Sequence, residues 1–86
     1  MTNLRSPMLR WVLGRGAARI ACEISQNADR TFDLRVTPSW NAGARVINRY
    51  TDVVGAMERH AEVAGVLRDS GWRVVERTPL HRQAVA

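Results

Sequence analysis

The sequence is poor in cysteine and in long apolar segments, and it contains no lysine at all. Cys22 is the only cysteine, so the chain forms neither an internal disulfide nor a four-cysteine metal site. The apolar stretch Met8–Leu13 is interrupted by Arg10 and is shorter than the apolar core of a signal peptide. Nothing approaches the roughly 18 continuous apolar residues of a membrane span. These absences predict a cytoplasmic protein that does not enter a membrane.

The thirteen basic residues are all arginine and outnumber the eight acidic residues, which gives a net charge of +5. Two explanations stay open. Arginine's planar guanidinium suits the recognition of phosphate and carboxylate groups. A GC-rich genome would equally favour arginine over lysine, together with the abundant alanine, glycine and valine. The charge is uneven, because residues 51–70 carry two arginines and four acids while the rest of the chain is strongly basic.

A chain of 86 residues is expected to form a single domain. The flanks show no hydropathy pattern, so we predict a flexible N-terminal tail over 1–8, one α+β domain over 9–77 and a flexible C-terminal tail over 78–86. A domain of this size buries only a small core, and association with another copy or another protein is a natural supplement.

Two segments alternate between apolar and polar residues with the period of a half-buried strand. The first is Ala18–Ile24 and the second is Phe32–Val36. The polar, turn-rich residues between them leave a loop of five to seven residues, which predicts an antiparallel hairpin.

Three further segments are candidate strands. Leu9–Leu13 is either a strand or a single helical turn, followed by a break at Gly14-Arg15-Gly16. Ala44–Tyr50 is a candidate third strand with imperfect alternation, and Trp72–Arg77 is the expected last strand, with Trp72 and Val74 facing inward.

The segment from about Thr51 to Ser70 has the pattern of an amphipathic helix. Thr51 or Asp52 is a suitable N-cap, and Gly71 stands where a left-handed residue commonly ends a helix. Apolar residues at steps of three and four define the expected buried face: Val53, Met57, Ala61, Ala64 and Leu67, with His60 at its border.

Together these elements predict an α+β fold in the order β-β-(β)-α-β. One amphipathic helix packs on one face of a three- to four-stranded, mostly antiparallel sheet. The helix crosses between the third and last strands, which predicts that those two strands are parallel, that the crossover is right-handed and that the sheet is mixed.

Catalytic chemistry finds little support in the sequence. Cys22 with His60 or His81 supplies a thiol and a base, but Cys22 lies on the apolar side of its strand, where cysteine behaves as a small hydrophobic residue. The positions four residues on either side of His60 are alanines, so the helix carries no paired metal ligands. We therefore expect no enzyme, no catalytic residue, no metal, no cofactor and no small-molecule substrate.

Strand alternation predicts a basic sheet face on the side away from the helix. An arginine-lined face with a tryptophan near its rim, either Trp40 or Trp11, would suit nucleic acid, with arginines on phosphates and the indole on a base. Asp33 and Glu23 share this face and would partly neutralise it through cross-strand pairs. The candidate nucleic-acid-binding residues are Arg19, Arg35, Arg45, Arg49, Arg73, Arg77 and Trp40.

The leading hypothesis is a small basic protein-interaction module that self-associates, as a dimer, or belongs to a larger assembly. An open edge strand would template β-augmentation by a partner. Ala61, Gly65 and Val66 on the helix form a second candidate interface. The small residues there permit close approach either of a partner or of the helix to its own sheet. Nucleic-acid binding is the alternative function.

Overall fold

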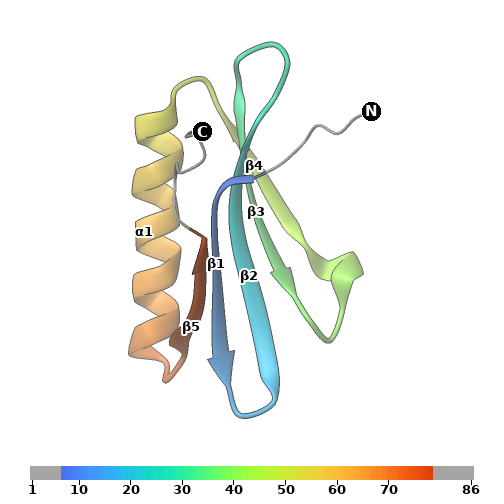
Figure 1. Ribbon diagram of the computed structural model, residues 1–86, viewed down its shortest axis with the longest axis vertical. Helices are drawn as coiled ribbons and strands as arrows, with labels where there is room; N and C mark the ends of the chain where they lie inside the picture. The colour runs from blue at the N-terminus through green and yellow to red at the C-terminus, as the bar shows by residue number, and fades with distance from the viewer. Residues whose placement is uncertain (1–6, 79–86) are drawn as a thin grey trace.

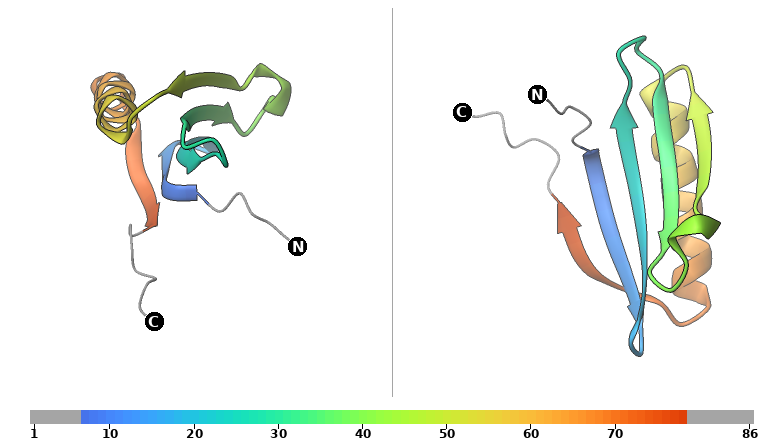
Figure 2. Two further views of the ribbon diagram at one scale, coloured as in Figure 1. Left: turned by 90° about the horizontal axis from the view of Figure 1, so that it is seen from above. Right: turned by 90° about the vertical axis from the view of Figure 1, so that its right-hand side faces the viewer.

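The structure is a computed structural model that describes residues 7–78. These residues form one antiparallel five-stranded sheet and one α-helix, which places the fold in the α+β class. The elements are β1 (Pro7–Arg15), β2 (Ala18–Gln26), β3 (Phe32–Pro38), a short 3₁₀ turn η1 (Ala42–Ala44), β4 (Val46–Tyr50), α1 (Val53–Asp69) and β5 (Arg73–Thr78). The strand order is β4-β3-β2-β1-β5, and α1 lies against one face of the sheet (Figures 1 and 2).

The apolar patch near the N-terminus is a strand and not a helical turn. Leu9–Leu13 lies in the middle of β1, which pairs with β2 on one side and β5 on the other. The expected break is a two-residue hairpin turn in which Gly16 has a φ of +59°. Glycine at the first central position with a positive φ is the pattern of a type II′ turn, whose twist matches that of the strands.

The hairpin of β2 and β3 is confirmed. The two strands pair antiparallel from Gln26↔Phe32 to Ile20↔Pro38, and five residues connect them. Within the loop, the Asp29 carboxylate accepts hydrogen bonds from the Thr31 backbone N–H at 3.1 Å and from its hydroxyl at 2.6 Å. This local bonding stabilises the turn without a proline or a glycine.

The sheet has more strands than expected, and the order of its strands corrects the predicted mixed topology. Every pairing among the described strands is antiparallel. The strands that flank α1, β4 and β5, lie at opposite edges of the sheet because β1 occupies the place beside β5. The helix therefore returns the chain across the whole sheet, as the view from above shows (Figure 2).

The helix follows its expected bounds and caps closely. Asp52 is the N-cap, with its Oδ1 accepting a hydrogen bond from the Gly55 N–H at 2.9 Å, and Gly71 has a φ of +96°. Such a cap satisfies one of the free N–H groups of the first turn. The prediction of Thr51 or Asp52 is thereby resolved in favour of Asp52.

The buried face of α1 matches the predicted one in part: Ala64 is buried and Leu67 packs on the core, as predicted. Ala56, His60 and Ala64 are buried, whereas Met57 is 39% exposed and Ala61 is exposed. Two of the three buried residues are alanines, whose small side chains permit close approach of the helix to the sheet.

The core consists of two apolar clusters between α1 and the sheet. One is centred on Leu13, Ile20 and Cys22. Trp72 and Val74 pack against it, as predicted for inward residues of the last strand. The other cluster contains Ile24, Leu34 and Ala56. Full burial of each large aliphatic side chain contributes about 1.5–3 kcal/mol.

The predicted terminal tails fall mainly outside the described residues. Pro7 and Met8 belong to β1 and Thr78 belongs to β5, so these two strands include three residues of the predicted tails. The other residues of the two predicted tails, 1–6 and 79–86, lie beyond the part that the structure describes.

Candidate functional site

The face of the sheet that points away from α1 is called the open face below. It carries arginines that pair with acidic residues on neighbouring strands. The Arg10 guanidinium on β1 donates to Glu23 on β2 at 2.8 Å and to Glu76 on β5 at 3.5 Å. Arg10 is half-buried, with its side chain 35% exposed. The predicted neutralisation through Glu23 is confirmed, and Glu76 adds a second acid that strand alternation alone did not assign to this role.

Asp33 is the centre of a second ion-pair cluster on the same face. Its residue exposure is 3%, and its carboxylate accepts two hydrogen bonds from Arg49, at 2.9 Å and 3.3 Å. The Arg35 guanidinium lies 4.0 Å away. The hydrogen bonds from Arg49 are the main reason that the pKa of Asp33 is lowered, since they favour the charged carboxylate. Both arginines therefore have an acidic partner, although the Arg49 side chain remains 61% exposed.

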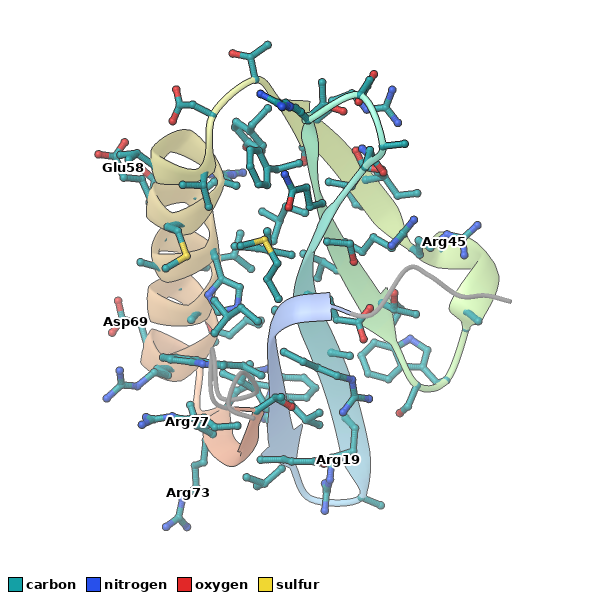
Figure 3. All side chains as sticks on the ribbon, turned by 45° about the horizontal axis from the view of Figure 1, so that its top comes forward. Arg19, Arg45, Glu58, Asp69, Arg73 and Arg77 are labelled. Carbon is teal, nitrogen blue, oxygen red and sulfur yellow. The ribbon has the colours of Figure 1, made fainter. Side chains whose placement is uncertain are left out.

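The arginines predicted to form one binding face are not brought together. Arg45 lies beside η1 near the β4 edge, whereas Arg73 lies on β5 at the opposite edge (Figure 3). The Arg19 guanidinium, at the β1–β2 hairpin, donates to the backbone carbonyls of Gly16 and Ala18, each at 2.9 Å. Ion pairs therefore interrupt the open face, which is not a continuous cationic surface.

Arg77 is on the other side of the sheet from the one predicted. The pairing of β1 with β5 shifts register between Val12 and Leu13, so that Val12 pairs with Glu76 but Leu13 pairs with Val74. This irregularity inserts Val75 and reverses the alternation beyond it. The Arg77 guanidinium consequently lies on the helix side, 4.6 Å from the centroid of the Trp11 ring.

Trp40, the predicted stacking residue, is 61% exposed in the turn that follows β3. It stacks on Trp72, with ring centroids 6.1 Å apart and an interplanar angle of 29°. One face of the Trp40 indole is thus occupied by the connection between α1 and β5, and Trp11 is under the helix. Neither tryptophan presents a free platform on the open sheet face.

The candidate helix interface lies on the outer surface of α1. Ala61 is exposed and Val66 is 65% exposed, as expected for a residue opposite the sheet. Gly65 is half-buried, yet a Cβ placed on it would meet no atom within 4 Å. At Gly55, by contrast, a Cβ would come within 3.3 Å of Tyr50. Close packing on the sheet therefore accounts for Gly55 and not for Gly65.

Cys22 and His60 meet in the core, but without the chemistry of a nucleophile and its base. Burial raises the pKa of the Cys22 thiol to about 11, which keeps it protonated at neutral pH. The ring nitrogen of His60 lies 3.3 Å from the backbone carbonyl oxygen of Cys22. Burial lowers the pKa of His60, so the ring is neutral near pH 7.

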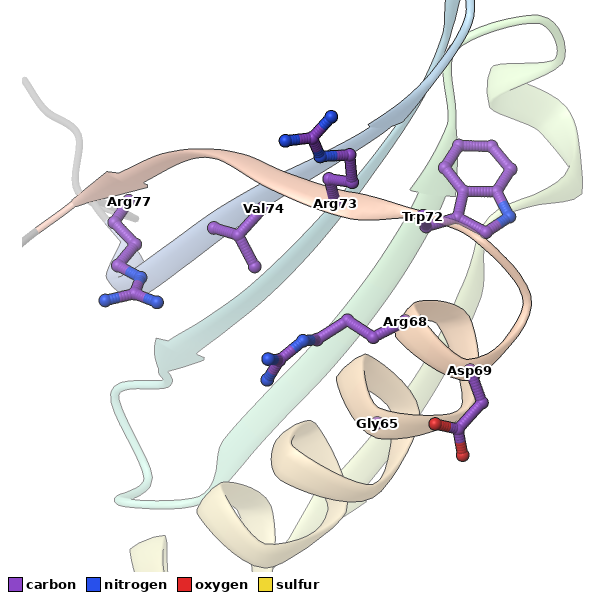
Figure 4. Close-up of a pocket in the computed structure, with 7 residues that line it drawn as sticks. All are labelled: Gly65, Arg68, Asp69, Trp72, Arg73, Val74 and Arg77. Atoms are coloured by element: carbon purple, nitrogen blue, oxygen red, sulfur yellow. The ribbon is translucent and has the colours of Figure 1, made fainter.

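Two hollows along α1 were missed by sequence reasoning. The first, of about 600 Å³, lies between the C-terminal half of α1 and β5 (Figure 4). It is lined by Gly65, Arg68, Asp69, Trp72, Arg73, Val74 and Arg77. The second, of about 470 Å³, lies between the N-terminal half of α1 and the start of β1. It is lined by Met8, Leu9, Ile24, Val53, Val54, Met57 and Glu58. The one feature of the sequence that could have indicated the first hollow is Gly65, a glycine in the interior of a helix.

The fold is that of an α+β domain in which a helix returns the chain across an antiparallel sheet. Comparison with protein-family models, with curated proteins and with solved structures finds no match to this chain. Within residues 7–78, no helix is long and apolar enough to cross a membrane. The same part of the chain holds no cluster of three or more histidine, cysteine or acidic residues that could bind a metal ion.

Proposed function

We propose that this protein is a protein-interaction module that self-associates through the free edge of β4. The proposal is supported above all by the position and the exposure of that strand. β4 is an edge strand, and its residues Val46–Arg49 are all exposed, with Val46 at 54% and Ile47 at 44%. An edge strand presents unpaired backbone N–H and C=O groups that a partner strand is able to bind.

The side chains of β4 favour pairing with a partner strand and do not block the edge against such pairing. Edge strands that avoid pairing commonly carry outward charges, prolines or bulges. Here the first two residues are apolar, and the Arg49 guanidinium is occupied by Asp33. The exposed Trp40 precedes η1, which leads directly into β4, and adds apolar area at the same end of the strand.

Antiparallel pairing of two β4 strands would join both sheets into one. Such an interface is isologous, so Val46 and Ile47 of each copy would contact the same strand of the other. Burying apolar edge residues would add core to a domain whose own core is small.

The paired arginines favour self-association over nucleic-acid binding on the open sheet face. Phosphate contacts need guanidinium groups that are free to replace counterions. Arg10, Arg35 and Arg49 are instead held by Glu23, Glu76 and Asp33. A polyanion would have to compete with these internal partners.

Sedimentation equilibrium at micromolar concentration tests the proposal, with Ile47→Lys as the disrupting variant. The added charge sits at the pairing edge, so we expect a dimer for the unmodified protein and a monomer for Ile47→Lys. Val66→Lys is the matched control, because Val66 is even more exposed but lies on α1. A monomeric unmodified protein would refute self-association, and dissociation by Val66→Lys alone would move the interface to the helix.

A further inference from the structure

Three arginines line the groove between α1 and β5. Arg68, Arg73 and Arg77 line it and form no ion pair with any residue over 7–78, in contrast to Arg10, Arg35, Arg49 and Arg59. Arg68 and Arg77 extend their side chains into the same space from opposite walls, whereas the Arg73 and Asp69 side chains point away from it (Figure 4). Like charges facing one groove repel each other, which an anion would relieve.

Arg77 is held in place by a stack that reaches into the core. Its guanidinium lies 4.6 Å from the centroid of the Trp11 ring. The Trp11 ring meets His60 edge-on, with centroids 5.1 Å apart, and His60 contacts the carbonyl oxygen of Cys22. Cation–π contact with a fixed indole restricts the arginine before any ligand arrives, which reduces the entropy lost on binding.

Gly65 keeps the groove open because it has no side chain. Glycine in a helix interior costs about 1 kcal/mol relative to alanine. No packing contact requires it, because a Cβ at this position would meet nothing within 4 Å. Gly65 lines the groove one turn before Arg68, so a side chain here would project toward the space that the arginines share.

We propose that this groove binds the phosphate group of a small phosphorylated molecule, with Arg68 and Arg77 as its ligands. Guanidinium groups form paired, charge-assisted hydrogen bonds with phosphate oxygens. A phosphate monoester carries close to two negative charges at neutral pH. Two arginines match this charge better than the single charge of a carboxylate. The volume of about 600 Å³ is within the usual range for small-molecule sites and accommodates an organic group beside the phosphate.

A small ligand fits the surroundings better than a nucleic-acid strand. A strand would need a basic track that continues beyond the groove. Along α1 the surface instead carries Glu62 and Glu58 and then the apolar hollow near Met57. Figure 3 shows Glu58 and Asp69 on the outer side of the helix, where they would repel a polyanion. The groove is also separate from the β4 edge, since β4 and β5 lie at opposite edges of the sheet.

Titration with phenyl phosphate at low salt tests this site, with the fluorescence of the three tryptophans as the readout, since Trp72 lines the groove. We expect saturable binding that weakens about tenfold or more in Arg68→Gln and in Arg77→Gln, because each loses a charge-assisted hydrogen bond. Arg59→Gln is the matched control, because Arg59 is a helical arginine already paired with Glu62 at 2.9 Å. Equal weakening in Arg59→Gln would mean general charge attraction and would overturn the proposal.

Gly65→Leu separates loss of the site from loss of the fold. The substitution fills the groove and replaces a helical glycine, so we expect a melting temperature that is unchanged or higher together with loss of phenyl phosphate binding. Full binding by Gly65→Leu would overturn the proposal. So would benzoate binding as tightly as phenyl phosphate, or binding only of single-stranded oligonucleotides with affinity that rises with their length.

Discussion

Acidification from pH 7.5 to 5.5 is expected to destabilise this protein through His60. The side chain is buried, with 2% exposure, and its ring contacts Trp11 and the carbonyl oxygen of Cys22. Burial lowers the pKa of His60 because the charged imidazolium would lose its hydration, and this effect outweighs the opposing hydrogen bond to Cys22. In the unfolded chain the same histidine titrates near its ordinary pKa of 6.5.

The magnitude follows from the difference in bound protons. Because the pKa of His60 is lower in the folded protein, the unfolded chain binds more protons than the folded protein near and below pH 6.5, and the free energy of unfolding falls as the pH falls. The loss between pH 7.5 and 5.5 is at most about 1.4 kcal/mol, the value for a histidine that stays neutral in the folded protein over this range. For a domain of this size, that loss lowers the melting temperature by about 5–10 °C. Above about pH 7.5 the contribution of His60 is fully present.

Thermal melting followed by circular dichroism at the two pH values measures the effect. The unmodified protein should show the decrease, and His60→Gln should lose most of the pH dependence even if its stability is lower at both values. His81→Gln measures the contribution of the other histidine of the chain to the pH dependence. Equal melting temperatures of the unmodified protein at pH 7.5 and 5.5 would refute the reasoning, as would an undiminished shift in His60→Gln.

Two more substitution and labelling results follow from the local structure. The Cys22 thiol is fully buried with a raised pKa, so iodoacetamide should modify it in denaturant and leave the native protein unmodified over the same period; equal rates would contradict its burial. Asp52→Ala should lower the free energy of unfolding in urea by about 1 kcal/mol because it removes the helix N-cap. Asp69→Ala, at the exposed C-terminal end of the same helix, should change it by less than about 0.5 kcal/mol.

Short-range patterns were sufficient for much of the secondary structure. The alternation in β2 and β3, the turn residues between them, and the cap pattern at Asp52 and Gly71 are all local features. They predicted the hairpin and the helix with its ends. Leu9–Leu13 stayed ambiguous because a short apolar run fits a strand or a helical turn equally well until pairing partners are known.

Long-range pairing determined what local patterns left open. Once β1 pairs with both β2 and β5, the strands on either side of α1 occupy opposite edges, and the sheet becomes antiparallel throughout. The register shift opposite Val12 and Leu13 then moves Arg77 to the helix side. Strict alternation within the sequence had placed it with Arg73 on the open face. A bulge of one residue leaves no trace in hydropathy but reverses every side chain beyond it.

The sequence by itself determined the α+β class, the hairpin, the helix with its caps, and a basic charge concentrated outside the helix, because these depend on residue type and on neighbours a few positions away. Only the tertiary structure decided which arginines are paired and which line a common groove. Arg10 meets Glu76 across 66 positions, and Arg49 meets Asp33 across 16. Arg68 and Arg77 share a groove only because α1 ends beside β5. Ion pairing depends on distance in space, which strand order and register set.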